Sequence, residues 1–539
     1  MMQAPLLLSS FVKRAEQYFP EKLIISRTGE QTHRIPYRDF AKRTRQLANA
    51  LTKLGMRRGT KVGTFGWNHH RHLEAYFGVP GAGAVLHMIN IRLSPEHILY
   101  VINHAEDEIL LVDRDLLPLI ERIAPQLKTV KHIVVMKDGT DLPTTGLKNI
   151  HSYEALVTAE LDDYVFPEDL DENAPAGMCY TSATTGNPKG VVYSHRGIVL
   201  HSLALGMADS MGLSERDIAL SVVPMFHANA WGLPFAGVLF GTTQVLPGPG
   251  FTPALLLDLI EQEKVTLTAG VPTIWLGVLK ELETNPRDLS SLRMIICGGS
   301  ASPKGLIRAF EEKYNIPFLT GYGMTETTPL VSLAVLTSAN EEASGDERID
   351  LRSLAGLPMP GLEVRIVNEN GIVPWDGQTM GELNVKGPWI ADEYYRDDRT
   401  AEAFRDGWLY TGDIAVMTPD GYIKLMDRTK DLIKSGGEWI SSVDLENALM
   451  THEAVFEAAV VAVPHEKWQE RPLACVVLKE GYEETDEMKA ELLQYLENQF
   501  AKWWVPDDVV FLKEVPKTSV GKFLKAALRK ELDGYYQGV

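Results

Sequence analysis

The sequence contains little cysteine and no long apolar run. Its three cysteines, Cys179, Cys297 and Cys475, lie far apart in the chain, so their spacing offers neither a CxxC metal or redox pattern nor a disulfide framework. No stretch approaches the roughly 20 apolar residues that a membrane-spanning helix needs. These shortages argue against a disulfide-stabilised scaffold and against an integral membrane segment, and we expect a cytoplasmic protein.

Positive charge is also in short supply. The 539 residues include 53 Lys and Arg against 72 Asp and Glu, which gives a formal net charge of −19. Nucleic acids and anionic membrane surfaces repel such a chain at long range. We therefore expect no nucleic-acid partner. An anionic small molecule must be met by local Lys or Arg side chains, by backbone N–H groups or by a bound cation.

The first half of the chain alternates between helical and strand-like patterns. A helical segment that ends at Gly55 is followed by a β-like run over Lys61–Phe65, and short apolar runs at 108–112, 218–223 and 294–297 are separated by helical stretches. This alternation favours an α/β architecture in layers. At about 150 residues per domain, the length corresponds to three or four compact units.

The pattern changes near residue 355. A polar, acidic stretch at 338–350 is predicted to be a surface loop, and the short β-like segments that follow predict a small sheet or barrel. From residue 429 a new βα pattern begins. We predict a large N-terminal domain over 1–428, made of layered α/β subdomains plus a β-barrel-like part, and a small α+β C-terminal domain over 429–539. The short junction between them suits a hinge, so we expect the C-terminal domain to be mobile.

One segment carries a chemical signal: residues 180–190 read YTSATTGNPKG. Backbone N–H groups and hydroxyls in such a loop make a neutral cradle for phosphate oxygens. The segment is not a GxxxxGK[ST] P-loop, because its glycines are spaced differently and no Ser or Thr follows Lys189. A Walker-type ATPase is therefore disfavoured. On composition alone, a Ser/Thr turn with a solvent-exposed lysine stays open.

This loop resembles the phosphate loop of the adenylate-forming superfamily, which includes acyl-CoA synthetases, luciferases and peptide-synthetase adenylation domains. Segments similar to further signatures follow in the family's order: PMFH at 224–227, GGS at 298–300, GYGMTE at 321–326, YTGD at 410–413, DRTKDLIKSGG at 427–437 and KTSVGK at 517–522. Six segments in one order are far more specific than any one of them. Ala183 departs from the pattern, since the family usually has glycine there, and this leaves the approach of the loop to pyrophosphate open.

The resemblance implies that a carboxylate attacks the α-phosphate of ATP and forms an acyl-adenylate and pyrophosphate. Both reactants are anions, so charge must be neutralised at the reacting centre. The family match places Mg²⁺ on Thr181 and Glu326, and oxygen ligands of this kind suit a hard cation. The residues that it assigns to nucleotide binding are Thr181, Ser182, Thr184, Thr185, Gly186, Lys189, Gly299, Thr320, Gly321, Tyr322, Thr325, Asp413, Arg428, Lys430 and Trp439.

Two of these assignments have specific chemistry. Asp413 matches the acid that binds the ribose hydroxyls, and Tyr322 matches an aromatic able to stack on adenine. Without the resemblance, they would be a turn aspartate and a buried aromatic.

The resemblance also implies a second step, in which CoA takes the acyl group and AMP leaves. The residues that it assigns to catalysis are Lys522, Glu326, Lys434 and His227. Lys522 is similar to the mobile lysine that contacts carboxylate and phosphate during adenylation. Rotation about Lys430 would withdraw it and present Gly436 and Gly437, which suit a narrow channel for CoA because glycine lets a thin chain pass close to the backbone.

The acyl substrate is indicated by an uncharged stretch. No Asp, Glu, Lys or Arg occurs between Asp217 and Asp258. Amino-acid activators of the superfamily keep an Asp shortly after the position of Phe226, whereas Ala228 and its neighbours here offer an ammonium group no partner. An apolar acyl tail fits such a lining better, and we assign the acyl pocket to Ala228, Trp231 and Gly323.

The HANAW segment at 227–231 resembles that of bacterial medium- and long-chain fatty acyl-CoA synthetases, in which this Trp gates a fatty-acid tunnel. The alternative for Trp231 is an ordinary core aromatic. We therefore predict a fatty acid–CoA ligase that uses ATP and Mg²⁺ with CoA as co-substrate, and related enzymes make a homodimer possible. The alternatives are a ligase for aryl or short branched acids, a luciferase-like oxidase, and an adenylate-only binding or carrier-loading module. Retention of Lys522 and of the KSGG segment argues against the last.

Overall fold

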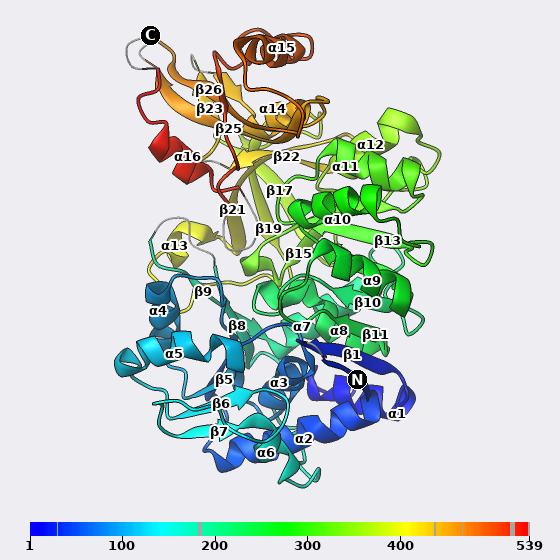
Figure 1. Ribbon diagram of the computed structural model, residues 1–539, viewed down its shortest axis with the longest axis vertical. Coiled ribbons are helices and arrows are strands. Elements are labelled where there is room, and N and C mark those ends of the chain that lie inside the picture. Colours follow the sequence, from blue (N-terminus) through cyan, green and yellow to red (C-terminus); the bar gives the residue numbers. More distant parts are fainter. Residues whose placement is uncertain are drawn as a thin grey trace.

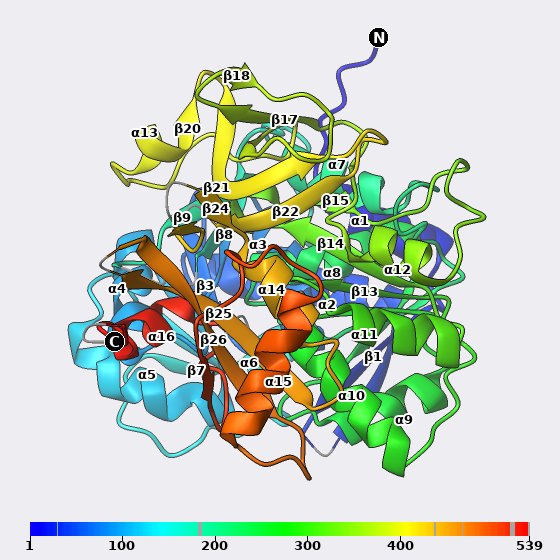
Figure 2. The same cartoon turned by 90° about the horizontal axis from the view of Figure 1, so that it is seen from above.

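The structure is a computed structural model that describes residues 1–29, 31–181, 186–428, 430–435, 438–465, 467–517 and 523–536. Figure 1 shows the C-terminal elements, in orange and red, as a separate body at one end of a larger one. Seen from above in Figure 2, this body lies over both the blue-to-cyan and the green parts of the chain. None of the described helices is long and apolar enough to cross a membrane.

A seven-stranded sheet occupies the blue-to-cyan part of the larger body. Its strand order is β7-β6-β5-β3-β4-β8-β9, and all pairs are parallel except β8 with β9. The strands are β3 (Lys61–Phe65), β4 (Val85–Met88), β5 (Ile109–Asp113), β6 (His132–Met136), β7 (Ile150–Ser152), β8 (Pro175–Tyr180) and β9 (Gly190–Ser194). The helices that cover one face are α2 (Tyr37–Lys53), α3 (His70–Gly81) and α6 (Tyr153–Thr158), and those on the other are α4 (Pro95–Ala105) and α5 (Leu117–Ile123).

A nine-stranded sheet lies mostly in the green part and ends in the blue strands β1 and β2. Its order is β16-β15-β14-β13-β12-β10-β11-β1-β2, with a parallel centre from β14 to β1. The strands are β1 (Leu23–Thr28), β2 (Gln31–Pro36), β10 (Ile218–Ser221), β11 (Thr243–Leu246), β12 (Leu267–Gly270), β13 (Met294–Gly298), β14 (Phe318–Gly323), β15 (Leu330–Leu333) and β16 (Leu357–Pro358). The helices around it are α1 (Ser9–Tyr18), α7 (His195–Leu205), α8 (Leu233–Phe240), α9 (Pro253–Glu263), α10 (Pro272–Thr284), α11 (Lys304–Arg308) and α12 (Gly345–Ser353). Ligands of such sheets bind beyond the carboxyl ends of the parallel strands, and β13 and β14 end there in two of the predicted segments.

Two smaller sheets complete the chain. The six-stranded sheet contains β17 (Glu363–Asn368), β18 (Gly371–Ile372), β19 (Gly381–Lys386), β20 (Phe404–Arg405), β21 (Trp408–Met417) and β22 (Ile423–Arg428), with α13 (Thr400–Ala403) beside it. The C-terminal body contains β23 (Ile433–Ser435), β24 (Glu438–Ile440), β25 (Val455–His465), β26 (Gln469–Leu478), β27 (Val509–Phe511), α14 (Ser442–Leu449), α15 (Asp486–Glu497) and α16 (Lys525–Glu531). The chain thus changes sheet between β22 and β23. The domain limits 1–428 and 429–539 themselves stay a prediction.

The predicted fold class, α/β with a large N-terminal part and a smaller C-terminal part, is confirmed. The surface loop predicted over 338–350 is wrong in its second half, because α12 begins at Gly345. Its first turn contains Asp346 and Glu347, which favour a helix N-terminus electrostatically, and its Ile349 side chain is buried in the core. Ion pairs of Arg348 and Arg352 with Glu311 also hold this helix.

Several histidines are buried in their neutral form, and this predicts acid sensitivity. Burial lowers the pKa of His201 to about 3 and those of His72 and His195 to about 4. The His201 ring accepts a hydrogen bond from the Leu330 N–H through Nε2 at 3.3 Å. Below the ordinary pKa of about 6.5, the unfolded chain binds a proton at this position and the folded chain does not, so stability is lost as the pH falls.

We expect His201 alone to contribute about 2 kcal/mol to the loss of stability between pH 7 and pH 5. Urea unfolding at both pH values, followed for the wild type and for His201→Gln, measures this contribution. The variant should lose less stability than the wild type over this interval. An equal loss in both proteins would contradict the assignment.

Candidate active site

The predicted phosphate loop joins β8 to β9, and its base is closed by hydrogen bonds. Thr181 N–H donates to the Lys189 carbonyl at 2.9 Å, and Lys189 N–H donates to the Thr181 hydroxyl at 3.1 Å. Gly186 has a φ of +73°, a backbone conformation that glycine adopts without strain. Ser182, Thr184 and Thr185, like Ala183, lie outside the described residues.

Lys189 and Glu326 meet through a tyrosine. Glu326 lies in a short 3₁₀ turn after β14 (η5, Thr325–Thr327) and is 4% exposed. The Tyr394 hydroxyl donates to Glu326 Oε1 at 2.7 Å and accepts from Lys189 Nζ at 2.7 Å, while Nζ lies 3.9 Å from Oε1. Burial lowers the pKa of Lys189, and the charges of Arg399 and Lys430 act in the same direction. A buried carboxylate and a cation thus face each other next to the loop.

Thr181 and Glu326 fit a magnesium ion that is shared with a nucleotide. They offer one hydroxyl and one carboxylate, and Mg²⁺ is usually held by one or two carboxylates plus substrate phosphates rather than by an all-protein cage. No cluster of three or more His, Cys, Asp or Glu side chains suited to a metal occurs in the described part of the chain. The ion would neutralise negative charge on the phosphates of ATP.

Asp413 and Tyr322, from different sheets, form a second polar contact. Asp413 lies in β21 and is 6% exposed. The Tyr322 hydroxyl donates to Asp413 Oδ2 at 2.5 Å, and Arg428 Nε lies 3.2 Å from Oδ1. Each carboxylate oxygen has two acceptor sites, so both can still accept from ribose hydroxyls. The structure therefore brings together three of the residues assigned to the nucleotide.

A closely packed wall connects β13 and β14. Gly298 pairs with Gly321, and a methyl group on Gly298 would lie 2.7 Å from the Gly321 carbonyl oxygen. The Thr320 side chain is buried, and its hydroxyl has no hydrogen-bond partner within the described residues. Gly299 follows with a φ of +86°. Buried polar groups are normally hydrogen-bonded, so this hydroxyl is an exception in the wall.

The uncharged stretch contains an unusual left-handed turn, η3 (Ala228–Gly232). Ala228, Asn229, Ala230 and Trp231 have φ values of 42°, 58°, 48° and 56°. Each such residue costs about 1–2 kcal/mol when it is not glycine, so the surrounding packing must hold the turn. A methyl group on Gly298 would lie 3.1 Å from the Trp231 ring, which places Trp231 against the nucleotide wall. Gly323 is the last residue of β14. His227 directly precedes the turn and is partly buried.

Sequence reasoning missed two tyrosines of this site. Tyr394 bridges Lys189 and Glu326, and Tyr193 donates from its hydroxyl to the Thr325 carbonyl at 2.8 Å. Burial raises the pKa of both hydroxyls, so they remain protonated donors. Tyr193 lies four residues after Lys189, and its closeness in sequence to the phosphate loop could have indicated a place in the site. Tyr394 belongs to none of the six motifs and gave no signal.

The C-terminal site residues are only partly described. Lys434 lies opposite Trp439 across β23 and β24, with Nζ 5.4 Å from the ring centroid. Lys430 is exposed between β22 and β23. Gly436, Gly437 and Lys522 lie outside the described residues. The roles of these residues therefore stay predictions.

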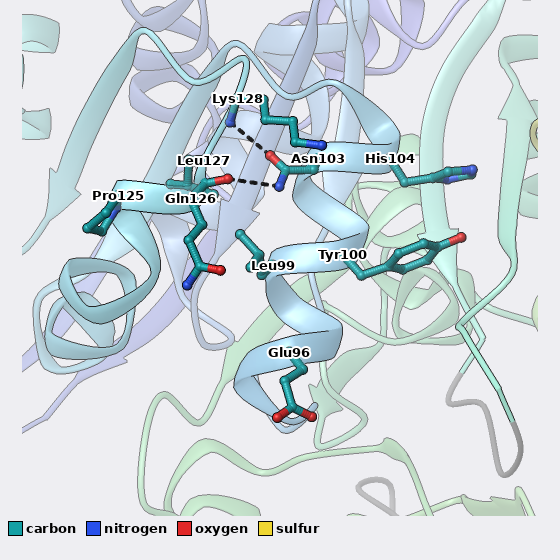
Figure 3. Close-up of a pocket in the computed structure, with 9 residues that line it drawn as sticks. All are labelled: Glu96, Leu99, Tyr100, Asn103, His104, Pro125, Gln126, Leu127 and Lys128. Carbon is teal, nitrogen blue, oxygen red and sulfur yellow. Dashed lines mark hydrogen bonds between the residues drawn. The ribbon is translucent and has the colours of Figure 1, made fainter.

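A surface hollow of about 720 Å³ lies away from these contacts. Figure 3 shows it between α4 and residues 125–128, with Asn103 bonded to the Gln126 carbonyl and to the Lys128 N–H. None of the predicted site residues lines it.

Lys189, at the end of the phosphate loop in one large sheet, meets Glu326 of the other through Tyr394, and the third sheet supplies Asp413 to the adjoining wall. This architecture is that of the adenylate-forming enzymes. The chain belongs to the AMP-binding enzyme family: the model of the AMP-binding enzyme matches residues 11–395, and that of the AMP-binding enzyme C-terminal domain matches residues 444–522.

Relatives cover the full length. The chain is 50% identical to a long-chain-fatty-acid–CoA ligase of Thermus thermophilus, over 100% of this chain and 98% of that protein. It is 43% identical to a 3-methylmercaptopropionyl-CoA ligase of Ruegeria lacuscaerulensis, over 98% of both. A solved anthranilate CoA ligase in complex with anthranoyl-AMP superposes with a TM-score of 0.88 at 26% identity and 98% coverage of both chains.

Proposed function

We propose that the protein is an ATP- and Mg²⁺-dependent fatty acid–CoA ligase. The observation that carries the substrate class is the uncharged stretch between Asp217 and Asp258, whose left-handed turn places Trp231 against Gly298. Such a lining accepts an apolar chain and offers an ammonium group no counter-charge. The 50% identity to a long-chain-fatty-acid–CoA ligase supports the same class.

In the first step, a carboxylate oxygen of the fatty acid attacks the α-phosphorus of ATP, and the bond to the β-phosphate oxygen breaks. Lys189 and the backbone of the phosphate loop bind phosphate oxygens, Thr181 and Glu326 would hold the cation, and Asp413 orients the ribose. Lys522 contacts the carboxylate and the α-phosphate. Fixed positive groups at the reacting centre stabilise the charge that develops in the transition state.

In the second step, the C-terminal domain, residues 429–539, rotates about Lys430 relative to residues 1–428. Lys522 is withdrawn, and Lys434 with Gly436 and Gly437 lines the path of CoA. The CoA thiolate attacks the acyl carbon, the bond from that carbon to the phosphate-linked oxygen breaks, and AMP leaves. Resemblance also supports a cytoplasmic location and a homodimer. Light scattering of the purified protein would test the homodimer.

Substrate class is tested by AMP release with ATP, Mg²⁺ and CoA across saturated acids from about C4 to C18, benzoate, anthranilate and the standard amino acids. Turnover that requires CoA and peaks on a medium or long chain is the expected result. A peak on aryl acids would overturn the substrate. Pyrophosphate exchange without CoA-dependent turnover would indicate an adenylate-only module.

3-Methylmercaptopropionate is the second candidate substrate, because a relative named for it is 43% identical over nearly the whole chain. It is a short acid whose thioether is apolar enough for the same lining. In the same panel, a kcat/KM for this acid at least about tenfold above that for butyrate and octanoate would favour it, since tenfold corresponds to about 1.4 kcal/mol of extra binding in the transition state.

Trp231 is expected to set chain-length selectivity. Trp231→Ala should shift the preferred acid by two or more carbons and change relative kcat/KM values by about 10- to 100-fold, since each buried methylene contributes about 0.8 kcal/mol. Trp375, an exposed Trp at 59%, provides the matched control as Trp375→Ala. An unchanged chain-length profile in Trp231→Ala would mean that Trp231 is an ordinary core aromatic.

A further inference from the structure

The two ends of the segment that contains Lys522 are held side by side. Lys517 and Phe523 form an antiparallel bridge, and Leu524 N–H donates to the Pro516 carbonyl at 2.7 Å. The residues between them, 518–522, lie outside the described residues. The described flanks nevertheless show where the chain leaves and returns to the C-terminal body.

Lys517, on the first flank, is paired with a buried acid of β25. Its Nζ lies 2.8 and 2.9 Å from the two carboxylate oxygens of Glu457. The Glu457 side chain is 4% exposed. This is a two-oxygen contact to β25, which pairs with β26 at the end of the C-terminal sheet and packs against α14 and α16.

Lys525, on the second flank, is paired in the same way. It begins α16, which lies beside β25 in Figure 1. Its Nζ lies 2.7 Å from Glu446 Oε1 of α14, which also accepts from the Val460 N–H at 2.7 Å. The exposed fractions of the two side chains are 11% and 8%.

The Lys525 contact continues to the junction of the domains. Lys525 Nζ also donates to the Ser442 hydroxyl, and the Ser442 hydroxyl and N–H both donate to Asp427 Oδ2. Asp427 is the last residue but one of β22, the last strand of the six-stranded sheet, and Arg428 follows it. A chain of hydrogen bonds thus connects the segment after Lys522 to the strand that precedes Lys430.

Stability alone does not account for the buried Lys525–Glu446 pair; in the other pair only Glu457 is buried, since the Lys517 side chain is 31% exposed. Removing a lysine and a carboxylate from water costs as much as or more than their attraction returns, and an apolar pair of similar size often stabilises better. What a buried ion pair does provide is a defined geometry. Here both pairs flank the same five residues, one on each side.

We propose that Lys517 and Lys525 are positioning residues for Lys522, which hold both flanks of its segment so that its ammonium group reaches the reacting carboxylate and phosphate. The pairing also neutralises two lysines within nine residues, so that neither competes with Lys522 for an anionic substrate. Misplacing a reacting group by about 1 Å can cost about 100-fold in rate. This inference rests on the role proposed above for Lys522.

The test separates the two half-reactions in Lys525→Met, which keeps the length of the side chain and removes its charge. Acyl-adenylate formation, measured by pyrophosphate exchange, should slow about 10- to 100-fold, with the KM for ATP and for the fatty acid nearly unchanged. Thioester formation from supplied acyl-adenylate and CoA should stay near the wild-type rate. Lys525→Arg should restore most of the adenylation rate, and Lys502→Met, an exposed lysine of the same domain, should change neither step.

A double substitution distinguishes positioning from general damage. If Lys525 acts through Lys522, then Lys522→Ala with Lys525→Met should be no slower in adenylation than Lys522→Ala alone, because the effects of residues in one unit do not add. Additive losses, or equal losses in both half-reactions, would overturn the inference. If Lys525→Met does not fold, Lys517→Met with Glu457→Gln is held to the same criteria.

The two proposals fail in different ways. If Lys522→Ala leaves adenylation intact, the role of Lys522 itself is wrong. If Lys522→Ala blocks adenylation and both positioning variants keep the wild-type rate, only the positioning role is wrong.

Discussion

Replacement of Lys522 by alanine should slow acyl-adenylate formation by about 100- to 1,000-fold, which is the usual effect of removing one group that stabilises transition-state charge. The carboxylate and ATP repel each other, and this lysine is the proposed cation that contacts both. Thioester formation should stay within about threefold of the wild type, because the two-step scheme withdraws Lys522 before CoA reacts.

Two assays on the same preparation measure this. Pyrophosphate exchange reports adenylation, and acyl-CoA formation from chemically prepared acyl-adenylate reports the second step. Lys502→Met serves as the control for loss of charge in the C-terminal domain. Equal losses in both assays would contradict a role of Lys522 in adenylation alone. A variant that keeps the wild-type rate of pyrophosphate exchange would contradict any role in adenylation.

Glu326→Gln should give the other large effect, a fall of about 100- to 1,000-fold in adenylation together with a higher Mg²⁺ requirement. Glutamine keeps the shape and can still accept the hydrogen bond from the Tyr394 hydroxyl, but it removes the charge that a hard cation needs. The rate is measured against Mg²⁺ concentration at saturating ATP.

Tyr394→Phe is the matched control for Glu326→Gln, because it removes the bridge between Lys189 and Glu326 and keeps both charges. Its rate should fall by about 10- to 100-fold, because a hydrogen bond to a charged group contributes about 1.5–3 kcal/mol. The Mg²⁺ titration should keep its midpoint in Tyr394→Phe and move to higher concentration in Glu326→Gln. An unchanged midpoint of the Mg²⁺ titration in Glu326→Gln would contradict the assignment of Glu326 as a ligand of the cation.

Much of the fold could be predicted because buried strands appear in the sequence as short apolar runs. The apolar run Lys61–Phe65 coincides with β3, and the runs at 218–223 and 294–297 contain or overlap β10 and β13. The order of strands in the two large sheets could not be predicted. It depends on contacts such as β1 with β11, which join residues more than 200 positions apart.

The sequence-based predictions for the candidate site rest on short motifs. Glu326, Asp413 and Tyr322 were assigned from segments of four to six residues, and the structure brings Asp413 and Tyr322 into contact. Tyr394 was not predictable, because its role comes only from the fold of the loop that brings its hydroxyl to Glu326. The left-handed turn over Ala228–Trp231 was equally hidden, since alanine and tryptophan do not favour a positive φ and only tertiary packing holds them there.

The most direct test of the proposed chemistry follows a labelled oxygen atom. A fatty acid with ¹⁸O in its carboxylate is converted with ATP and CoA, and the nucleotide product is examined by mass spectrometry. Attack of the carboxylate on the α-phosphorus, followed by cleavage of the acyl carbon–oxygen bond, predicts one ¹⁸O atom in AMP. Label in inorganic phosphate with formation of ADP, or AMP without label, would contradict an acyl-adenylate and with it the proposed function.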